Sequence, residues 1–454
     1  MHVSDPSRRG FLKTAATLAV APFILPARVW SQQSAPSKRL TLGCIGMGKQ
    51  MGLHLSRLVQ RDDVQVLAVC DVDTTRREHA KKLVEDAYSA AAGSTYQGCA
   101  AYNDFRELLA RRDIDAVLIA TPDHWHAFVA IAAVKAGKDV YCEKPLTYNI
   151  HEAVTLVQAV RQSDRVFQTG SQQRSMMEFR VAAELVRNGV LGRVHAIDVH
   201  FKDPAKPCAY PAEPVEPGLD WKFWCGPGPL VDYNPALSPR GLPKGYPNWR
   251  RTREFGGGDI TDWGAHHIDI SHWALDEDGG GPVEIRAPKS WETAKEGSQL
   301  VYANGTVLTH KNDVPVHRGV SFYGANGEIH VFRGKFEFIL GGKPIHRFRT
   351  KELDPEMSLE RAVTLTAREY LADAKIKLRV SKDHFGDFVD AVHTRRRPIC
   401  DVAIGVSTVI ACHLMNFGYY YGAQARWDPV KRQFTSGGDA KWLTRERYTD
   451  GWAV

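Results

Sequence analysis

The stretch from residue 42 to residue 52 reads LGCIGMGKQMG and leads from an apolar segment into a helical pattern. Gly46 and Gly48 permit a tight turn and let a pyrophosphate approach both the backbone and the start of the helix. The third glycine, Gly52, comes one residue later than in the pattern G-x-G-x-x-G. Glycine turns also occur for purely structural reasons, so this stretch needs support from its surroundings.

Asp71 gives that support, because it ends the next apolar segment 23 residues after Gly48. A carboxylate at this point accepts hydrogen bonds from the adenosine ribose and repels a 2′-phosphate. The sequence therefore favours NAD, although Arg76 and Arg77 keep NADP open because either could reach a 2′-phosphate. From this region we expect cofactor contacts by Gly46, Met47, Gly48, Gln50, Met51 and Asp71.

Residues 38–170, which surround the glycine turn, alternate short apolar runs with helical patterns. Nearly continuous apolar strands are typical of a parallel sheet that helices cover on both faces. We therefore predict a doubly wound α/β domain of the Rossmann type that binds NAD(P). Its strands are predicted at 40–45, 64–70, 115–120, 138–142 and 166–169, and its main helices at 77–88, 125–136 and 150–162.

Residues 171–454 do not continue the regular alternation of strands and helices, and they are predicted to form a second α/β domain with an open, mainly antiparallel sheet. A loop over 202–250 holds eleven of the 24 prolines. A loop this long is usually a lid or binding wall, or else partly disordered. Its tryptophans could form platforms for sugar rings or could simply pin the loop down. Other elements are predicted at 176–187, 193–201, 283–287, 300–303, 306–309, 328–332, 382–394 and 402–421.

Two motifs follow strands of the first domain, at the sheet edge where such folds bind ligands. The first, TPDHWH at 121–126, predicts cofactor contacts by Thr121, Pro122 and His126, although Asp123 or Thr121 could instead cap the next helix. The second, EKP at 143–145, places a lysine before a proline, where a cis bond would aim its ammonium. Lys144 could stabilise a developing alkoxide, or form an ordinary surface pair with Glu143.

The stretch 256–269, GGGDITDWGAHHID, is the most informative part of the second domain. On a helix, Asp262, His266 and Asp269 stand along one face. A carboxylate near an imidazole can orient it for proton removal from an alcohol. The plainer interpretation is a helix capped by Asp259 with ordinary polar positions. His267 and His272 lie nearby, but the spacing matches no tight ligand pattern, and we predict no metal site.

Taken together, these motifs resemble the Gfo/Idh/MocA family (glucose–fructose oxidoreductase, inositol dehydrogenase, rhizopine catabolism). The resemblance covers nearly the whole chain after its first 31 residues. It implies NAD(P), polyhydroxylated substrates and an oligomer built through the open sheet. It also implies that Lys144 acts at the reacting hydroxyl and Glu143 beside the cofactor, with His266 as acid/base and Asp262 as its orienting partner. The neighbouring His267 leaves open which imidazole acts, and the substrate itself is not inherited.

Residues 1–31 have the charged, apolar and cleavable regions of a secretory signal, with the twin-arginine pair Arg8-Arg9 before Phe11 and an apolar run. We expect export by the twin-arginine route to the periplasm or another extracytoplasmic space. The run is too short to span a bilayer. Removing this segment lowers the formal charge from +7 to about +4, too little for a nucleic-acid footprint. The eight cysteines form no C-x-x-C pair, and only a Cys208–Cys225 bridge stays open.

Three functions are consistent with these observations. The first is an exported oxidoreductase that moves a hydride between a carbinol of a sugar, glycoside or cyclitol and a tightly held nicotinamide cofactor. The second is an NAD-dependent glycosidase or lyase that oxidises its substrate transiently. The third is a non-enzymatic protein that binds nucleotide or sugar, against which the intact Lys144, Asp262 and His266 argue.

Overall fold

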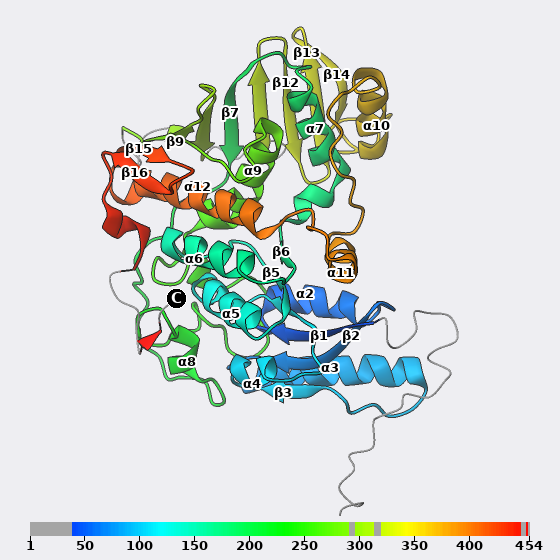
Figure 1. The fold of residues 1–454 in the computed structure, drawn as a ribbon, viewed down its shortest axis with the longest axis vertical. Helices are drawn as coiled ribbons and strands as arrows, with labels where there is room; N and C mark the ends of the chain where they lie inside the picture. Colours follow the sequence, from blue (N-terminus) through cyan, green and yellow to red (C-terminus); the bar gives the residue numbers. More distant parts are fainter. Residues whose placement is uncertain (1–38, 290–295, 313–318, 446–450, 453–454) are drawn as a thin grey trace, which may run out of the picture.

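The computed structural model describes residues 39–289, 296–312, 319–445 and 451–452, and these residues form two packed sheets with their helices (Figure 1). The predicted signal, residues 1–31, lies outside the described residues. The prediction of a doubly wound parallel sheet followed by a second, mainly antiparallel sheet is confirmed.

Within the described residues, the first sheet has six parallel strands in the order β3-β2-β1-β4-β5-β6, the arrangement of a dinucleotide-binding fold. Each residue of β4 and β5 is buried, which explains why these segments are apolar apart from Asp139 at the start of β5. The strands are β1 (Leu40–Ile45), β2 (Val64–Cys70), β3 (Ala100–Tyr102), β4 (Ala116–Ile119), β5 (Asp139–Cys142) and β6 (Phe167–Thr169).

Helices cover both faces of this sheet (Figure 1). One face packs against α2 (Lys49–Leu58) and α3 (Thr74–Ala92), and the other against α4 (Phe105–Leu109), α5 (Asp123–Lys135) and α6 (Ile150–Arg161). Local sequence sets where α3 begins and ends: the Asp73 side chain accepts from the backbone of Arg76, and Gly93 adopts a left-handed conformation with φ of 65°.

The first domain is completed by a helix from far along the chain. In α11 (His384–Thr394), Phe385, Phe388 and Val389 join the hydrophobic cluster that contains Met51 and Leu55 of α2. The chain therefore leaves the first domain after β6 and returns to it more than 200 residues later. The sequence analysis predicts this helix but counts it, with the rest of residues 171–454, in the second domain, whereas its apolar side chains pack in the core of the first.

The second sheet, over the part of the chain that the structure describes, has ten strands in the order β14-β13-β12-β11-β7-β10-β9-β8-β15-β16, and only β7 and β10 pair in parallel. The bounds of the strands are β7 (Val194–His200), β8 (Glu284–Arg286), β9 (Glu296–Val301), β10 (Val307–Lys311), β11 (Val320–Gly324), β12 (Gly327–Phe332), β13 (Lys335–Leu340), β14 (Lys343–Phe348), β15 (Gln424–Asp428) and β16 (Gln433–Ser436). The sequence did not predict β11 or β13 to β16.

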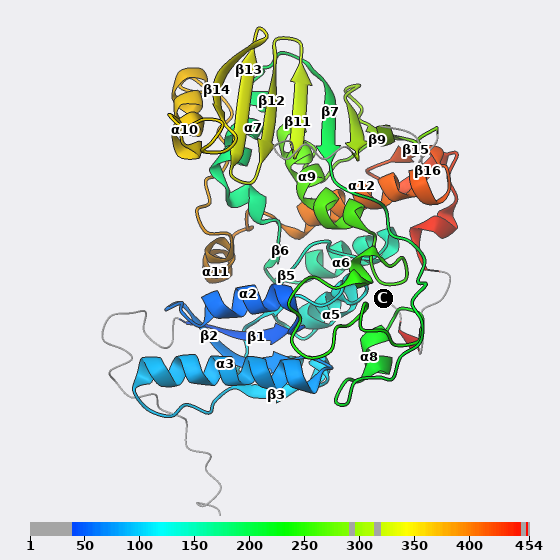
Figure 2. The ribbon, with the colours of Figure 1, turned by 180° about the vertical axis from the view of Figure 1, so that it is seen from behind.

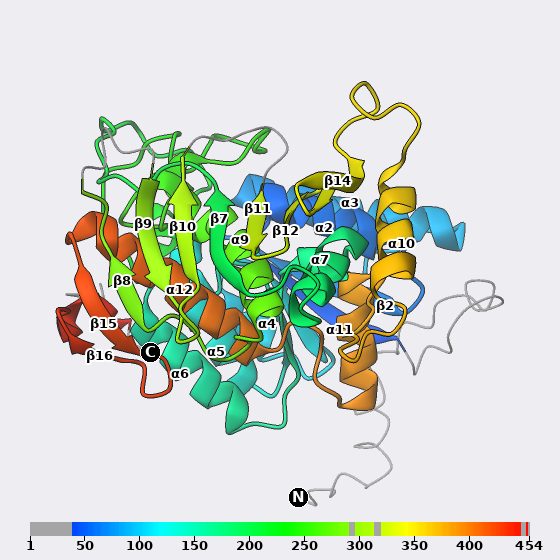
Figure 3. The ribbon, with the colours of Figure 1, turned by 90° about the horizontal axis from the view of Figure 1, so that it is seen from above.

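Helices pack against one face of this sheet, namely α7 (Met177–Arg187), α9 (Asp259–Leu275), α10 (Leu359–Tyr370) and α12 (Val402–Tyr420). They lie in front of the strands in Figure 1 and behind them in Figure 2. The view from above shows α12 crossing beneath the sheet toward α6 of the first domain (Figure 3). By length and composition α12 could cross a membrane, but 83% of its apolar window is buried between the two domains.

The predicted long loop between β7 and α9 folds over the first domain and has its own small core. Trp221 and Trp224 of the short helix α8 (Trp221–Cys225) stack at 4.6 Å and pack with Tyr233, Leu237 and Phe255. These two tryptophans therefore pin the loop down. Cys208 and Cys225 are free thiols, so the bridge left open by the sequence is not formed.

Candidate active site

A cavity of about 390 Å³ lies between the two domains. Its wall combines the carboxyl-terminal edge of the first sheet, the long loop, the start of α9 and the turn between β12 and β13. This edge is where open parallel sheets bind their ligands. The cavity therefore joins the predicted cofactor motifs to the predicted catalytic motifs.

The glycine turn fits a pyrophosphate. Gly46 has φ of +90°, and a Cβ there would lie 2.7 Å from the backbone nitrogen of Thr121, so only glycine is accommodated. Gly48 faces open space, with no atom within 4 Å of the position that a Cβ would take, and it precedes α2 without a side-chain cap. The first backbone N–H groups of α2 therefore remain available to an anion.

The second strand ends on the carboxylate expected for ribose binding. Asp71 accepts from the backbone nitrogens of Met47 at 2.6 Å and Asp73 at 2.9 Å, and burial raises its pKa. Arg76 is occupied by Asp73 and by the long loop, where it donates to Ser238 and to the carbonyl of Gly241.

Arg77 is also occupied, because it donates to the backbone carbonyl of Asp71 and to the side chain of Asn103. Neither Arg76 nor Arg77 is therefore free to receive a 2′-phosphate, and the site fits NAD.

Most of the predicted cofactor residues share this cavity. The sequence-predicted residues in its wall are Gly46, Gly48, Gln50, Asp71, Thr121, Pro122, His126, Glu143 and Lys144. Two others lie outside it: Met47 contributes its backbone nitrogen to Asp71, and Met51 packs in the core beneath α2. His126 is held by Nδ1, which lies 2.6 Å from the carbonyl oxygen of Pro145.

Lys144 and Asp262 meet across the domain boundary. Lys144, whose bond to Pro145 is cis, places Nζ 2.5 Å from Oδ1 of Asp262. Arg250 of the long loop binds the other carboxylate oxygen. Burial alone would raise the pKa of Asp262, but Lys144 and Arg250 outweigh it and hold that pKa well below its usual range. The carboxylate therefore stays charged and fixes both cations.

His266 is the imidazole of α9 that lines the cavity. It is buried, and its Nε2 lies 3.0 Å from Nη2 of Arg333, while Nδ1 has no hydrogen-bond partner within the described residues. Burial, together with the charges of Lys144 and Arg333, lowers the pKa of His266. A neutral imidazole whose Nε2 accepts a hydrogen bond can serve as a base.

The other candidates on α9 have different surroundings. His267 lies outside the cavity wall and packs against Phe201 and Trp263. Asp269, predicted on the same helix face as Asp262, forms a buried ion pair with Arg174 instead. The structure therefore brings together Lys144, Asp262 and His266 and leaves these two apart.

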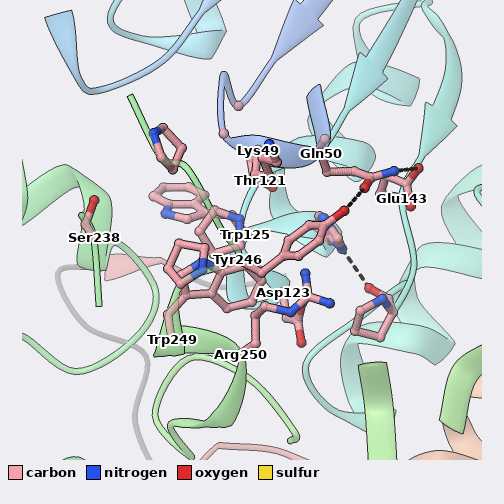
Figure 4. Close-up of a pocket in the computed structure, with 18 of the residues that line it drawn as sticks. Lys49, Gln50, Thr121, Asp123, Trp125, Glu143, Ser238, Tyr246, Trp249 and Arg250 are labelled. Atoms are coloured by element: carbon pink, nitrogen blue, oxygen red, sulfur yellow. Dashed lines mark hydrogen bonds between the residues drawn. The ribbon is translucent and has the colours of Figure 1, made fainter. Parts of the chain in front are cut away.

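Glu143 is a bridge between several elements and not a surface residue. Its Oε1 lies 2.7 Å from Nε2 of His54 and also accepts from Gln50 and Gln172. Burial opposes ionisation, but the hydrogen bond and charge of His54 prevail and lower the pKa of Glu143 to about 2. Gln50 in turn accepts from the hydroxyl of Tyr246, which ties the long loop to the start of α2 (Figure 4).

Asp123 lies in the cavity wall beside Arg250 and does not cap α5 (Figure 4). Burial, reinforced by the charge of Asp262 and opposed by Arg250 and Lys144, raises the pKa of Asp123 to about 8. The side chain is therefore largely protonated at neutral pH. The alternative that the sequence left open, in which the Asp123 side chain caps this helix, is therefore not found.

Sequence reasoning missed several residues of this site: His54, Gln172, Tyr246, Arg250 and Arg333. Each of them acts through a contact with a residue distant in sequence or through the shape of a loop. Only the density of prolines and aromatic residues around Arg250 gave any indication that its loop lines a site.

Comparison with known proteins agrees with this geometry. Residues 40–171 match the Gfo/Idh/MocA model, described as an oxidoreductase family with an NAD-binding Rossmann fold. This part of the chain is therefore similar to the NAD-binding Rossmann domain of that family.

Three curated relatives cover different amounts of the chain. A myo-inositol 2-dehydrogenase of Thermotoga maritima is 32% identical over 37% of this chain and 47% of its own length. An uncharacterised oxidoreductase of Synechocystis is 27% identical over 69% of this chain and 76% of its own length. A glycosyl hydrolase family 109 protein of Stenotrophomonas maltophilia is 26% identical over 48% of each chain. The match thus spans about half the length of the first and third relatives.

Solved structures share the fold over most of both chains. The aldose-aldose oxidoreductase of Caulobacter crescentus, complexed with glycerol, has a TM-score of 0.55 and 18% identity over 86% of this chain and 99% of its own. The WlbA dehydrogenase of Bordetella pertussis, in complex with NADH and UDP-GlcNAcA, has a TM-score of 0.56 and 16% identity over 86% of this chain and 98% of its own. At this identity the likeness concerns the fold.

Proposed function

We propose that the chain is an NAD-dependent oxidoreductase of the Gfo/Idh/MocA type that acts on a CH–OH group of a sugar, glycoside or cyclitol. The observation that carries the proposal is the convergence of Lys144, Asp262 and His266 in the same cavity as the glycine turn. The inositol dehydrogenase among the relatives supports the substrate class.

The chemistry follows from these side chains. NAD, when bound, supplies the hydride acceptor. Lys144 holds the substrate hydroxyl oxygen and stabilises the negative charge that develops on it. Asp262 keeps the ammonium charged and aimed, because both of its carboxylate oxygens are bound to cations. Neutral His266 takes the hydroxyl proton on Nε2, displacing the hydrogen bond from Arg333.

The proposal includes a tightly held cofactor and export. The long loop supports tight binding, since Arg76 fastens it to the first domain at Ser238 and Gly241 and Tyr246 fastens it at Gln50. The signal pattern in residues 1–31 supports export of the folded protein by the twin-arginine route to an extracytoplasmic space. A homo-oligomer formed through the open face of the ten-stranded sheet belongs to the same proposal.

The relative named as a glycosyl hydrolase family 109 protein favours a second candidate. In that case oxidation of the substrate is transient, elimination cleaves the glycoside, and the hydride returns. Lys144 and His266 would serve this reaction in the same positions, because removal of a proton beside a carbonyl also needs a base and an oxyanion partner.

One experiment separates these alternatives. The mature protein is purified without added nucleotide, and the near-ultraviolet absorbance of reduced nicotinamide is followed while sugars, glycosides and cyclitols are added. A stoichiometric rise with one compound supports net oxidation and names its class. Release of a free sugar from a glycoside without a net absorbance change supports the transient reaction. Absence of nucleotide after denaturation contradicts a tightly held cofactor.

A further inference from the structure

Arg333 reaches the active site from a short, well-anchored turn. It is in the two-residue turn Arg333-Gly334 between β12 and β13, where Phe332 pairs with Lys335. Gly334 has φ of +72°, and its nitrogen donates to Oε1 of Glu178 at 3.1 Å. A turn this short, fastened from outside, fixes the position from which the Arg333 side chain reaches the cavity.

Three further contacts fix the guanidinium itself. Its Nη2 lies 3.0 Å from Nε2 of His266, and its central carbon lies 5.0 Å from the ring centre of Trp263. In the amide orientation that satisfies both groups, Gln173 accepts from Nε of Arg333 and donates to the backbone carbonyl of His266. Arg333 is therefore held against the predicted base by contacts that involve no carboxylate of the described residues.

The charges around His266 do not balance. Among the described residues, the cationic side chains that line the substrate half of the cavity are Lys144, Arg250, Arg251 and Arg333, and Arg251 pairs with Asp259. Asp262 is shared between Lys144 and Arg250, one carboxylate oxygen to each. Within the same described residues, no carboxylate forms an ion pair with Arg333.

In the described part of the wall, none of the other acidic groups forms an ion pair with Arg333. Glu143 forms hydrogen bonds with His54 and two glutamines, and Asp259 pairs with Arg251. Asp123 is largely neutral at neutral pH. Lys49 also has no carboxylate partner in the described part of the chain, but it begins α2 beside Gly48, where the cofactor phosphates would lie. Within the described residues, Arg333 is thus the cation in the substrate half of the cavity that has no carboxylate in contact with it.

We infer that the substrate is an acidic carbohydrate whose carboxylate binds Arg333. This inference rests on the proposed function, because it takes His266 as the base at the reacting hydroxyl. Since the guanidinium and the imidazole are in hydrogen-bond contact, the carboxylate belongs on a carbon next to the reacting carbinol or one carbon further. The planar fork of an arginine matches a carboxylate with two parallel hydrogen bonds.

The carboxylates near Arg333 also discriminate between anions. A carboxylate brings one negative charge to Arg333, whereas a phosphate dianion brings a second one close to Asp262 and Glu143, whose charges already act on this arginine. Binding of the carboxylate also frees Nε2 of His266, because Nη2 of Arg333 then donates its hydrogen bond to the substrate and no longer to this nitrogen. Substrate binding and exposure of the base are thereby coupled.

The test compares sugar acids with their neutral counterparts on the protein as purified. Glucuronate, galacturonate and gluconate are paired with glucose, galactose and sorbitol, and glucose 6-phosphate is added as a dianion. Binding is measured by calorimetry, and oxidation by the absorbance of reduced nicotinamide. We expect at least one acid to exceed its neutral partner about tenfold or more in affinity and in kcat/KM.

Variants assign this preference to Arg333. In Arg333→Gln the ratio of acid to neutral substrate should fall to near one, whereas Arg333→Lys should retain part of it. Lys343→Gln, an exposed charge removed from the neighbouring β14, should leave the ratio unchanged. The ratio is informative even though Arg333 contacts His266, because a general loss of base function affects both substrates alike.

Each result has a definite meaning. An acid preference that survives in Arg333→Gln, a preference for the phosphate, or no binding of any acid overturns the inference. Binding of an acid that depends on Arg333 but produces neither reduced nicotinamide nor a cleaved product supports the inference and contradicts the proposed function. Oxidation of neutral sugars alone supports the function and overturns the inference.

Discussion

Nζ of Lys144 lies 2.5 Å from Oδ1 of Asp262, and the two residues belong to different domains. Lys144 follows β5 of the first sheet, whereas Asp262 is in the first turn of α9. The ion pair that arranges the reacting groups therefore also joins the domains. A change at either residue should affect both activity and stability.

Replacing Asp262 by Asn should therefore have two effects. It leaves Lys144 and Arg250 without their shared counterion, and loss of one partner of a largely buried pair costs about 3 kcal/mol of unfolding free energy. We also expect kcat to fall about 100-fold or more, because the ammonium is no longer aimed. Denaturant unfolding and steady-state kinetics measure the two effects. The exposed change Lys135→Met is the control, and unchanged kcat in Asp262→Asn would contradict this role.

The pH dependence of kcat/KM should report the environment of His266. Burial, with the charges of Lys144 and Arg333, lowers its pKa, so the base form persists below the ordinary histidine value of 6.5. The acidic limb of the profile should accordingly lie below pH 6.5. Arg333→Gln removes one positive charge, raises the pKa of His266 and moves this limb to higher pH. A limb that stays in place would show that His266 is not the titrating base.

Asp123 should make stability depend on pH. Its pKa is about 8 in the folded protein and 3.8 in the reference state, so between these values only the unfolded chain is ionised. Stability therefore decreases as pH rises from about 4 to about 8 and is then constant. Asp123→Asn removes this cost, and its gain in melting temperature should be larger at pH 8 than at pH 5. Equal gains at both values would contradict a protonated Asp123.

The anchoring of the long loop by Arg76 should govern how firmly nucleotide is retained. In Arg76→Met the hydroxyl of Ser238 and the carbonyl of Gly241 lose their donor, and the loop loosens. We expect faster release of nucleotide, followed as the fraction retained after gel filtration. Arg240→Met removes an arginine from the same loop that pairs with Glu213 near solvent, and should retain nucleotide like the parent. Equal retention in both variants would argue against an anchoring role.

Local sequence was sufficient for the features that one short segment determines. The glycine turn, Asp71 and the motifs around Lys144 and His266 each combine residues that are close along the chain, so spacing alone indicated their chemistry. The strands β1 and β2 were predicted at their observed bounds because continuous apolar runs identify buried parallel strands.

The remaining features depend on contacts that spacing does not encode. Arg333 meets His266 across 67 positions, and Tyr246 meets Gln50 across 196. Arg76 kept NADP open as an alternative, but the loop residues that occupy it lie more than 160 positions away in the sequence. The strand β13 was missed although Phe336 and Phe338 alternate with Lys335 and Glu337. The strand β14 was missed because its partly exposed, mixed sequence has neither continuous apolar character nor a clear alternation.

The return of α11 to the first domain has a consequence for the order of events during synthesis. Phe388 and its neighbours cover the side of the first sheet that also packs against α2, so that side is incomplete until residue 394 has left the ribosome. The nucleotide-binding unit cannot reach its final form as an early, independent product. Most of the second domain must be made first, and the nascent chain presents an uncovered apolar surface during that interval. Chaperones that recognise such surfaces therefore have a defined period in which to act.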